Sequence, residues 1–160
     1  MQLEIRRATP GDAAQIARYN IAMAAETEQV TLEPERALRG VAALLADPGK
    51  GFYLVAVSGH RTVGQLMITY EWSDWRNGNF WWIQSVFVAP EFRRRGVFRR
   101  LYGYVMETAR ADSGVCGVRL YVDRRNRRAQ QAYASLGLER TAYEIFEVDF
   151  VMRGKPGAHS

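Results

Sequence analysis

Residues 86–101 read VFVAPEFRRRGVFRRL, the most informative stretch of the chain. An apolar, β-rich run ends at Pro90, an arginine-rich segment follows, and Gly96 precedes apolar residues at helical spacing. A strand, a basic loop and a helix are therefore expected in that order. A helix start presents several backbone N–H groups to one point, and arginines add bidentate donors. The stretch is typical of a phosphate or pyrophosphate site; the alternative is a solvated basic helix start.

Most of the positive charge lies in two arginine clusters. Of the 22 basic residues 20 are arginines, and Arg93–Arg100 carries +5 while Arg119–Arg128 carries +4. Because the whole chain carries +5, the other 142 residues sum to −4. The protein is thus mildly acidic outside the clusters. This pattern indicates a localised anionic ligand and disfavours a nucleic acid, which would need a broad basic surface.

The composition predicts one globular domain without a membrane partner. The chain has 160 residues, 48% of them hydrophobic and 24% charged. Its longest apolar runs are six residues (41–46 and 52–57), whereas a membrane helix needs about 18. No signal segment opens the chain, so we expect a cytoplasmic location. Cys116, the single cysteine, excludes an internal disulfide, and with only two histidines no metal site is expected.

The rest of the chain predicts a mixed α/β domain over residues 1–153, followed by a flexible tail at residues 154–160. Hydrophobic periodicity and turn-forming residues give the elements. The expected helices are residues 10–25, 34–45 and 97–111 and a short one after Asn126, which would be its N-cap. The expected strands are residues 3–5, 52–58, 62–70, 80–88, 118–122, 141–146 and 148–152.

Two blocks of sequence resemble the GNAT superfamily of N-acetyltransferases. The family signature Arg/Gln-x-x-Gly-x-Gly/Ala corresponds to RRRGVF at residues 93–98. A second family run, Asn-x-x-Ala-x-x-x-Tyr followed by x-x-Gly-Phe, corresponds to Asn126, Ala129, Tyr133 and SLGL at residues 135–138. The resemblance implies a GNAT-like central sheet, mixed but mostly antiparallel, of six to seven strands. It also implies about four flanking helices and a splayed strand pair.

The same resemblance implies an acetyl-CoA site. The backbone of residues 86–88 would pair with the pantetheine arm, as an added strand does. The amides of residues 94–99 would hold the pyrophosphate, Asn126 would bond the pantetheine or thioester end, and Tyr133 would protonate the leaving CoA thiolate. The alternative for Tyr133 is a core residue with a satisfied hydroxyl. The full set of candidate cofactor residues is Val86, Phe87, Val88, Arg93, Arg94, Arg95, Gly96, Val97, Phe98, Arg99, Asn126 and Tyr133.

One of these positions departs from the family pattern. Phe98 stands where the family has a small residue. We expect its ring to turn away from the diphosphate and to pack with Leu101 and Tyr102.

The sequence does not supply an obvious general base. Many relatives carry a glutamate on the strand before the glycine loop, where this chain has Gln84 and Ser85, and neither is a base at neutral pH. A water chain that ends on Glu26 or Glu71 is the favoured replacement, although each of them also fits an ordinary surface carboxylate.

All four tryptophans lie within residues 72–82. Rings and carboxylates together can bind an amine, which makes Trp72 and Trp75, with Glu71 and Asp74, candidates for substrate binding. A dimer contact is the alternative for this pair, and Trp81 and Trp82 are expected to be structural. The candidate substrate residues are Glu26, Glu71, Trp72, Asp74, Trp75 and Gln84.

The leading hypothesis is an N-acetyltransferase that moves an acetyl group from acetyl-CoA to a primary amine by direct attack in a ternary complex, releasing CoA. The acceptor would be a small molecule or a peptide, and exposed aromatic residues and edge strands are compatible with a homodimer. The alternative is a non-catalytic acyl-CoA-binding sensor or interaction module, which the missing glutamate supports. A P-loop is excluded because no Gly-Lys-Ser/Thr follows the glycine.

Overall fold

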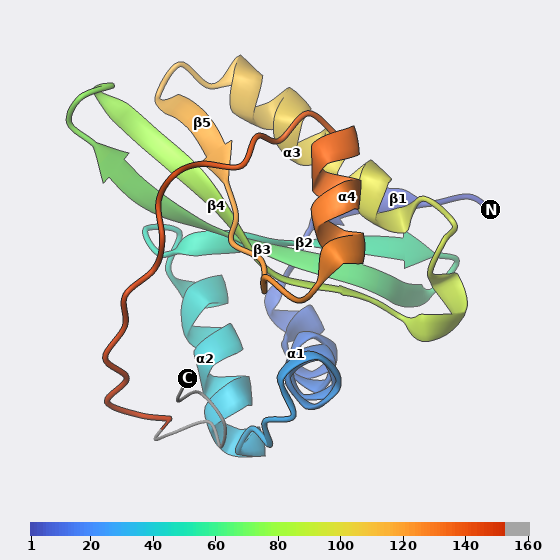
Figure 1. Cartoon of the computed structure of the whole chain (residues 1–160). Coiled ribbons are helices and arrows are strands. Elements are labelled where there is room, and N and C mark those ends of the chain that lie inside the picture. The colour runs from blue at the N-terminus through green and yellow to red at the C-terminus, as the bar shows by residue number, and fades with distance from the viewer. Residues whose placement is uncertain (153–160) are drawn as a thin grey trace. The chain divides into compact units, whose positions relative to one another are not determined.

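Five strands form one sheet in the order β1-β2-β3-β4-β5 (Figure 1). The computed structural model describes residues 1–152, so the predicted tail lies outside the described residues. The strands are β1 (Glu4–Arg7), β2 (Gly51–Ser58), β3 (Arg61–Ser73), β4 (Gly78–Val88) and β5 (Val115–Arg119). The helices are α1 (Ala13–Glu28), α2 (Pro34–Ala46), α3 (Val97–Ala111) and α4 (Arg127–Ser135), with short 3₁₀ turns η1 (Pro10–Asp12) and η2 (Pro90–Phe92).

The described chain divides into two compact units. The first, Met1–Tyr121, holds the whole sheet and helices α1, α2 and α3. The second begins at Val122 and holds α4. None of the helices formed by residues 1–152 combines the length and apolar character that crossing a membrane requires.

The strands of the first unit alternate in direction until the last pair. Strands β1 to β4 are antiparallel neighbours, whereas β5 runs parallel to β4. The parallel pairing covers only Asn79 to Trp82 of β4, although β4 continues to Val88. The second half of β4 therefore extends beyond its pairing with β5, which is the expected splayed strand pair.

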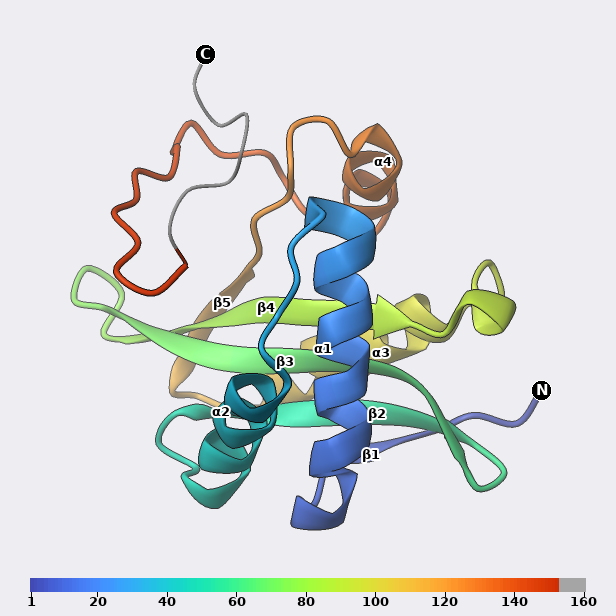
Figure 2. The same ribbon diagram turned by 90° about the horizontal axis from the view of Figure 1, so that it is seen from below.

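Helices cover both faces of the sheet (Figure 2). On one face, α1 and α2 bury a cluster that includes Ile16, Val41 and Val55. On the other face, α3 packs so closely against β3 that a Cβ on Gly64 would lie 2.7 Å from Cγ1 of Val97. This contact fixes the first residue of α3 against the sheet, and with it the basic turn that precedes the helix.

The second unit contains one capped helix and an irregular segment. The side-chain oxygen of Asn126 accepts a hydrogen bond from the N–H of Ala129 at 3.1 Å, so the predicted N-cap is confirmed. The helix ends before Gly137, whose φ of 91° is the left-handed conformation that glycine adopts most easily.

The two strands predicted at residues 141–146 and 148–152 are wrong, because the described chain forms no strand there. The sheet consequently has five strands instead of six or seven. Side chains take up backbone donors locally: Asp149 Oδ1 accepts the N–H groups of Val151 and Met152, both at 2.8 Å. Such local bonds compete with a strand ladder. The large apolar side chains of residues 143–152 are exposed, for example that of Phe146 (94%).

The strand predicted at residues 118–122 also begins earlier than expected, at Val115. Asp112 Oδ1 accepts the N–H of Gly114 at 2.8 Å, and the Gly114 carbonyl accepts the N–H of Asn79 at 2.8 Å. The turn is thus already bonded to the start of β4, and pairing starts immediately after it. The sequence pattern showed the apolar residues of this strand, but it could not show that the turn before the strand bonds to the start of β4.

Candidate functional site

The basic turn between β4 and α3 has the backbone shape of an anion site. Arg94 and Gly96 both adopt positive φ, 62° and 78°. Gly96 is the N-cap of α3. A Cβ added at this position would meet no protein atom within 4 Å, so a glycine is needed here for its positive φ and not because another part of the protein lies close. Backbone N–H groups of a helix's first turn have no intrahelical acceptor, and turns with left-handed residues form anion-binding concavities. The arrangement could hold a diphosphate.

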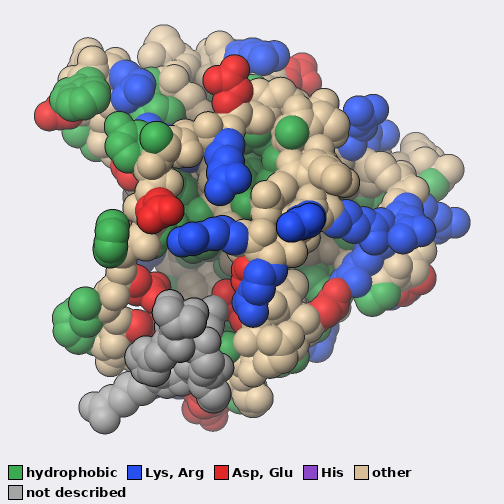
Figure 3. All heavy atoms as spheres, viewed as in Figure 1, with side chains coloured by type: hydrophobic (Ala, Val, Ile, Leu, Met, Phe, Trp, Pro, Cys, Tyr) green, Lys and Arg blue, Asp and Glu red, His purple; other side chains and the backbone are tan. Residues whose placement is uncertain are grey.

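Figure 3 shows several Lys and Arg side chains, in blue, gathered at one side of the face in view. The arginines of the turn between β4 and α3 differ in their contacts. Arg93 forms a bidentate pair with Glu26 of α1 at 2.6 and 3.0 Å, and its Nε donates to the carbonyl of Val88 at 2.9 Å. Arg100 donates to the carbonyl of Leu3, at 3.0 Å. Arg94, Arg95 and Arg99 are exposed and form no ion pair with any residue among 1–152. The Arg95 guanidinium lies 5.5 Å from the ring centroid of Phe92, which leaves Arg94 and Arg99 as the cations of the turn most available to an incoming anion.

The ring of Phe98 lies beside that of Tyr102, with centroids 6.1 Å apart, as expected for that pair.

Strand β4 contains a bulge at the point where it leaves β5. Met67 of β3 pairs with Gln84 and Gln65 pairs with Phe87, so two residues of β4 face one of β3. One of the two, Ser85, has a φ of 51°, a left-handed conformation that is costly for a residue with a Cβ. The bulge shifts the ladder just before residues 86–88.

The backbone of Val88 points away from β3. Val88 faces Gly64 in the ladder, while the next N–H, that of Ala89, donates to the carbonyl of Val63 at 2.9 Å. In an antiparallel pair this pattern marks Gly64 and Val88 as a non-hydrogen-bonded pair. The N–H and C=O of Val88 consequently face the edge where the pairing with β5 has ended. The carbonyl accepts from Arg93, and the N–H is directed to the same side.

Four polar residues meet beneath this bulge, and sequence reasoning missed three of them. Gln65 is completely buried; its Nε2 donates to Asn20 Oδ1 at 2.8 Å and lies 3.4 Å from the carbonyl of Ser85. Asn20 Nδ2 in turn lies 3.5 Å from the Tyr53 hydroxyl, whose pKa is raised by burial. Gln65 could have been noticed as the one polar residue inside an apolar run of β3, GQLMI.

The two carboxylates favoured as bases lie at opposite ends of β4. Glu26 is bound to Arg93 beside Val88, whereas Glu71 pairs with Phe80 in the ladder and accepts from Arg119 at 2.6 Å. Eight residues of strand separate Phe80 from Val88, about 25 Å. The hydrogen bond from Arg93 lowers the pKa of Glu26, so this carboxylate stays ionised and is a weak base.

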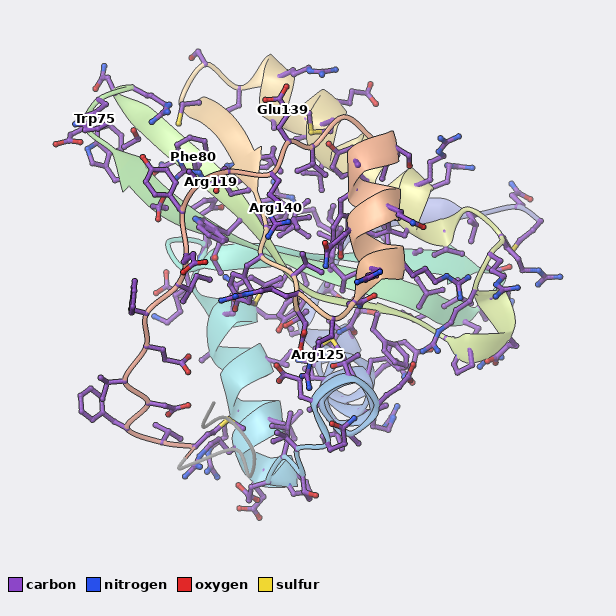
Figure 4. The ribbon with its side chains drawn as sticks, in the orientation of Figure 1. Trp75, Phe80, Arg119, Arg125, Glu139 and Arg140 are labelled. Carbon is purple, nitrogen blue, oxygen red and sulfur yellow. The ribbon has the colours of Figure 1, made fainter. Side chains whose placement is uncertain are left out.

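The remaining substrate candidates do not gather at one point. Gln84 lies in the middle of β4, with its amide donating to Thr69 Oγ1 at 2.6 Å. Trp72, Asp74 and Trp75 lie at the tip of the β3–β4 hairpin, where Trp75 is 82% exposed (Figure 4). A small amine beside Val88 would not reach this tip.

Aromatic and cationic contacts hold the hairpin. The Arg119 guanidinium lies 3.6 Å from the Phe80 ring centroid, and both side chains are labelled in Figure 4. Trp81 is buried and meets Phe52 edge-on at 5.1 Å, in agreement with a structural role.

The second unit carries the last two candidates. Asn126 caps α4, as described above, and Tyr133 lies in the same helix, half-buried. Burial raises the pKa of the Tyr133 hydroxyl, so the group keeps its proton at neutral pH. A protonated phenol is what a general acid requires.

Comparison with known proteins gives one consistent result. The model of the acetyltransferase (GNAT) family matches residues 16–138. Thialysine N-epsilon-acetyltransferase of Bos taurus is 30% identical over 150 residues, covering 84% of this chain and 83% of the bovine one. A crystal structure described as a possible acetyltransferase from Clostridium difficile 630 superposes with a TM-score of 0.88 at 42% identity, covering 95% of this chain and 100% of that one.

A more distant structure shares the fold. AAC(6')-Iy, in complex with the bisubstrate analogue CoA-S-monomethyl-acetylneamine, has a TM-score of 0.74 at 16% identity, covering 93% of this chain and 99% of that one.

The two uncommitted arginines give a first prediction. We expect the double variant Arg94→Ala/Arg99→Ala to bind CoA about 10-fold more weakly, because two charge-assisted contacts to phosphate are lost. The matched control is Arg36→Ala/Arg39→Ala, which removes the same charge from α2 and should change the dissociation constant less than twofold. Isothermal titration with CoA measures both. Equal losses in the two variants would assign the effect to net charge and remove the specific role of the turn.

Proposed function

The chain belongs to the acetyltransferase (GNAT) family, and we propose that it transfers an acetyl group from acetyl-CoA to a primary amine by direct attack within a ternary complex. One observation carries the proposal. The outward-facing backbone of Val88 lies at the end of β4, and the basic turn with its two left-handed residues follows within eight residues. A ligand with an amide-containing arm and a diphosphate matches that sequence of donors.

The residues present fit acetyl-CoA in chemical type. The open edge of residues 86–88 offers strand-like hydrogen bonds to the pantetheine arm. The turn amides, with Arg94 and Arg99, would neutralise the diphosphate. Bound acetyl-CoA would supply the acetyl group as a thioester. The N–H of Val88 is the first candidate for polarising the thioester carbonyl, because it is directed to the open side of β4.

The proposed acceptor is a small molecule with a primary amine at the end of a flexible chain. The bovine relative, by its name, acetylates the ε-amine of thialysine, and transfer of that substrate class to this chain is part of the proposal. An ammonium group near the cofactor end of β4 would meet the ionised carboxylate of Glu26. The hairpin tip would then bind only a longer acceptor such as a peptide.

The proposal is tested by incubating the protein with acetyl-CoA and thialysine, lysine or a polyamine and by measuring thiol release and the mass of the product. We expect amine-dependent thiol release with one of these acceptors. Acetyl-CoA and CoA, but not ATP, should also raise the melting temperature, since a ligand at about 100 times its dissociation constant stabilises the native state by about 2.7 kcal/mol. Stabilisation without transfer to any amine would favour a non-catalytic acyl-CoA-binding module. The absence of stabilisation would refute the site.

The position of Glu26 gives a prediction about the amine substrate. We expect Glu26→Gln to lower kcat/KM at least 10-fold, because the variant loses the carboxylate that would attract the amine substrate to the cofactor end of β4. Glu71→Gln, the matched control at the far end of β4, should stay within twofold of the wild type. Equal activity of both variants would exclude Glu26.

The pH dependence should have a definite sign. Because the pKa of Glu26 is lowered, its carboxylate is already ionised at pH 6, and the fraction of neutral amine limits the rate. We therefore expect kcat/KM to rise steadily from pH 6 to pH 9. A plateau reached near pH 7 would instead indicate a dedicated general base of near-neutral pKa.

Tyr133 is proposed to protonate the departing CoA thiolate. We expect Tyr133→Phe to lower kcat by about 100-fold with little change in CoA affinity, because the ring stays and only the proton donor is lost. Rates with acetyl-CoA and binding of CoA by titration separate the two effects. Wild-type turnover in this variant would leave Tyr133 as a packing residue.

A further inference from the structure

Gln65 is the buried polar side chain of the sheet, with 0% of its surface exposed, and packing alone does not explain it. Its Oε1 atom has no hydrogen-bond partner among the described residues. A buried amide with an unpaired acceptor is less favourable than an apolar side chain of the same size. Methionine or leucine would fill this place between the sheet and α1 at less cost. The reason for a polar residue at this position must therefore lie in the contacts of the amide nitrogen.

The nitrogen of Gln65 joins two distant parts of the chain. Nε2 donates to Asn20 Oδ1 at 2.8 Å and lies 3.4 Å from the carbonyl oxygen of Ser85. Asn20 belongs to α1, and Ser85 is the bulge residue of β4. The short bond to Asn20 fixes the direction of the amide, since a buried side chain with one good bond has little freedom to turn. The second N–H then faces the bulge.

The bulge residue needs support. Ser85 keeps a φ of 51°, which residues with a Cβ adopt only where the surroundings compensate the strain. The carbonyl that Gln65 approaches belongs to this residue, and the peptide that follows leads directly into Val86. A rotation at Ser85 would change the path of residues 86–88 and with it the direction of the outward-facing N–H and C=O of Val88. The amide of Gln65 is thus placed to hold the conformation on which the open edge of β4 depends.

We propose that Gln65, held in place by Asn20, is a positioning residue for acetyl transfer. It fixes the Ser85 bulge and so directs the N–H of Val88 toward the reacting carbonyl, without touching the substrate itself. This role rests on the proposed function of the β4 edge. Its consequence is that the loss of the amide lowers the rate of the chemical step, although the protein remains folded and still binds its ligands.

The variant Gln65→Met tests this role, because it keeps the side-chain volume and removes both the donor and the unpaired acceptor. We expect an unchanged or higher melting temperature, a kcat at least 10-fold lower and an amine KM within threefold of the wild type. Tyr19→Phe is the control on the same helix; it removes the hydroxyl that donates to the carbonyl of Thr62 at 2.6 Å, leaves the contacts of Gln65 in place, and should stay within twofold in kcat. Wild-type kcat in Gln65→Met would overturn the proposal.

A second pair of variants separates positioning from stability. Asn20→Asp keeps the oxygen that accepts from Gln65 and should retain kcat, whereas Asn20→Leu removes it and should lower kcat as Gln65→Met does. Adding Ser85→Gly to Gln65→Met should restore part of the rate, since glycine adopts a positive φ without support. No recovery in the double variant, together with equal kcat in the two Asn20 variants, would contradict the positioning role.

A readout independent of activity distinguishes failure of this inference from failure of the proposed function. Amide hydrogen exchange in the free protein reports the bulge directly. We expect the amide of Phe87, which pairs with Gln65 in the ladder, to exchange at least 10-fold faster in Gln65→Met than in the wild type, with those of β2 unchanged. If the wild type transfers no acetyl group but this acceleration appears, the proposed function fails and Gln65 still holds the bulge. Unchanged exchange would refute the role of Gln65, whatever the activity.

Discussion

The early end of the pairing between β4 and β5 is the constraint on which the candidate site depends. Backbone N–H and C=O groups in a fold almost always find partners. A strand that continues past its neighbour leaves such groups without a strand partner, which is unfavourable. Here β4 continues from Trp82 to Val88 beyond the last pair with β5, and a bulge at Ser85 shifts its register there. A ligand that adds to this edge would supply a partner for the Val88 N–H, while the Val88 carbonyl already accepts from Arg93. The remaining features of the first unit hold that edge in place.

Two sets of contacts act on the free part of β4. From below, the buried amide of Gln65 approaches the bulge carbonyl. From the end, Arg93 bonds the Val88 carbonyl and at the same time binds Glu26 of α1. Helix α1 is therefore tied to β4 at two points, by Asn20 through Gln65 and by Glu26 through Arg93. This double attachment explains how a strained residue such as Ser85 can persist in a strand without a neighbour on one side.

The sequence predicted those parts of the fold that local patterns determine. Helix α3 has the predicted bounds, because Gly96 and the apolar spacing of Val97, Leu101 and Val105 mark both its start and its buried face. The N-cap Asn126 is also confirmed, because a cap depends on residues that are close in sequence. The start of β5 was missed because it depends on the bonding of Gly114 to Asn79. The strands at residues 141–152 were wrong because β-propensity does not reveal whether a pairing partner exists.

The candidate site likewise contains features that local sequence determines and features that depend on tertiary contacts. The turn before α3 could be predicted from its glycine and the helix that follows, but the pairing of Arg93 with Glu26 joins residues 67 positions apart. Gln65 and Asn20, 45 positions apart, carry no shared motif. Local sequence could therefore indicate a candidate anion site, while the contacts of Arg93 and Gln65 with helix α1 emerged only from the tertiary structure.

Pairing of the free edge of β4 with the cofactor can be measured by hydrogen exchange with and without saturating CoA. If the edge pairs with the cofactor, the peptide containing residues 86–88 becomes strongly protected, together with the turn at residues 94–99. Protection confined to the turn would exclude this pairing, because the diphosphate would then bind while the strand edge stays unpaired.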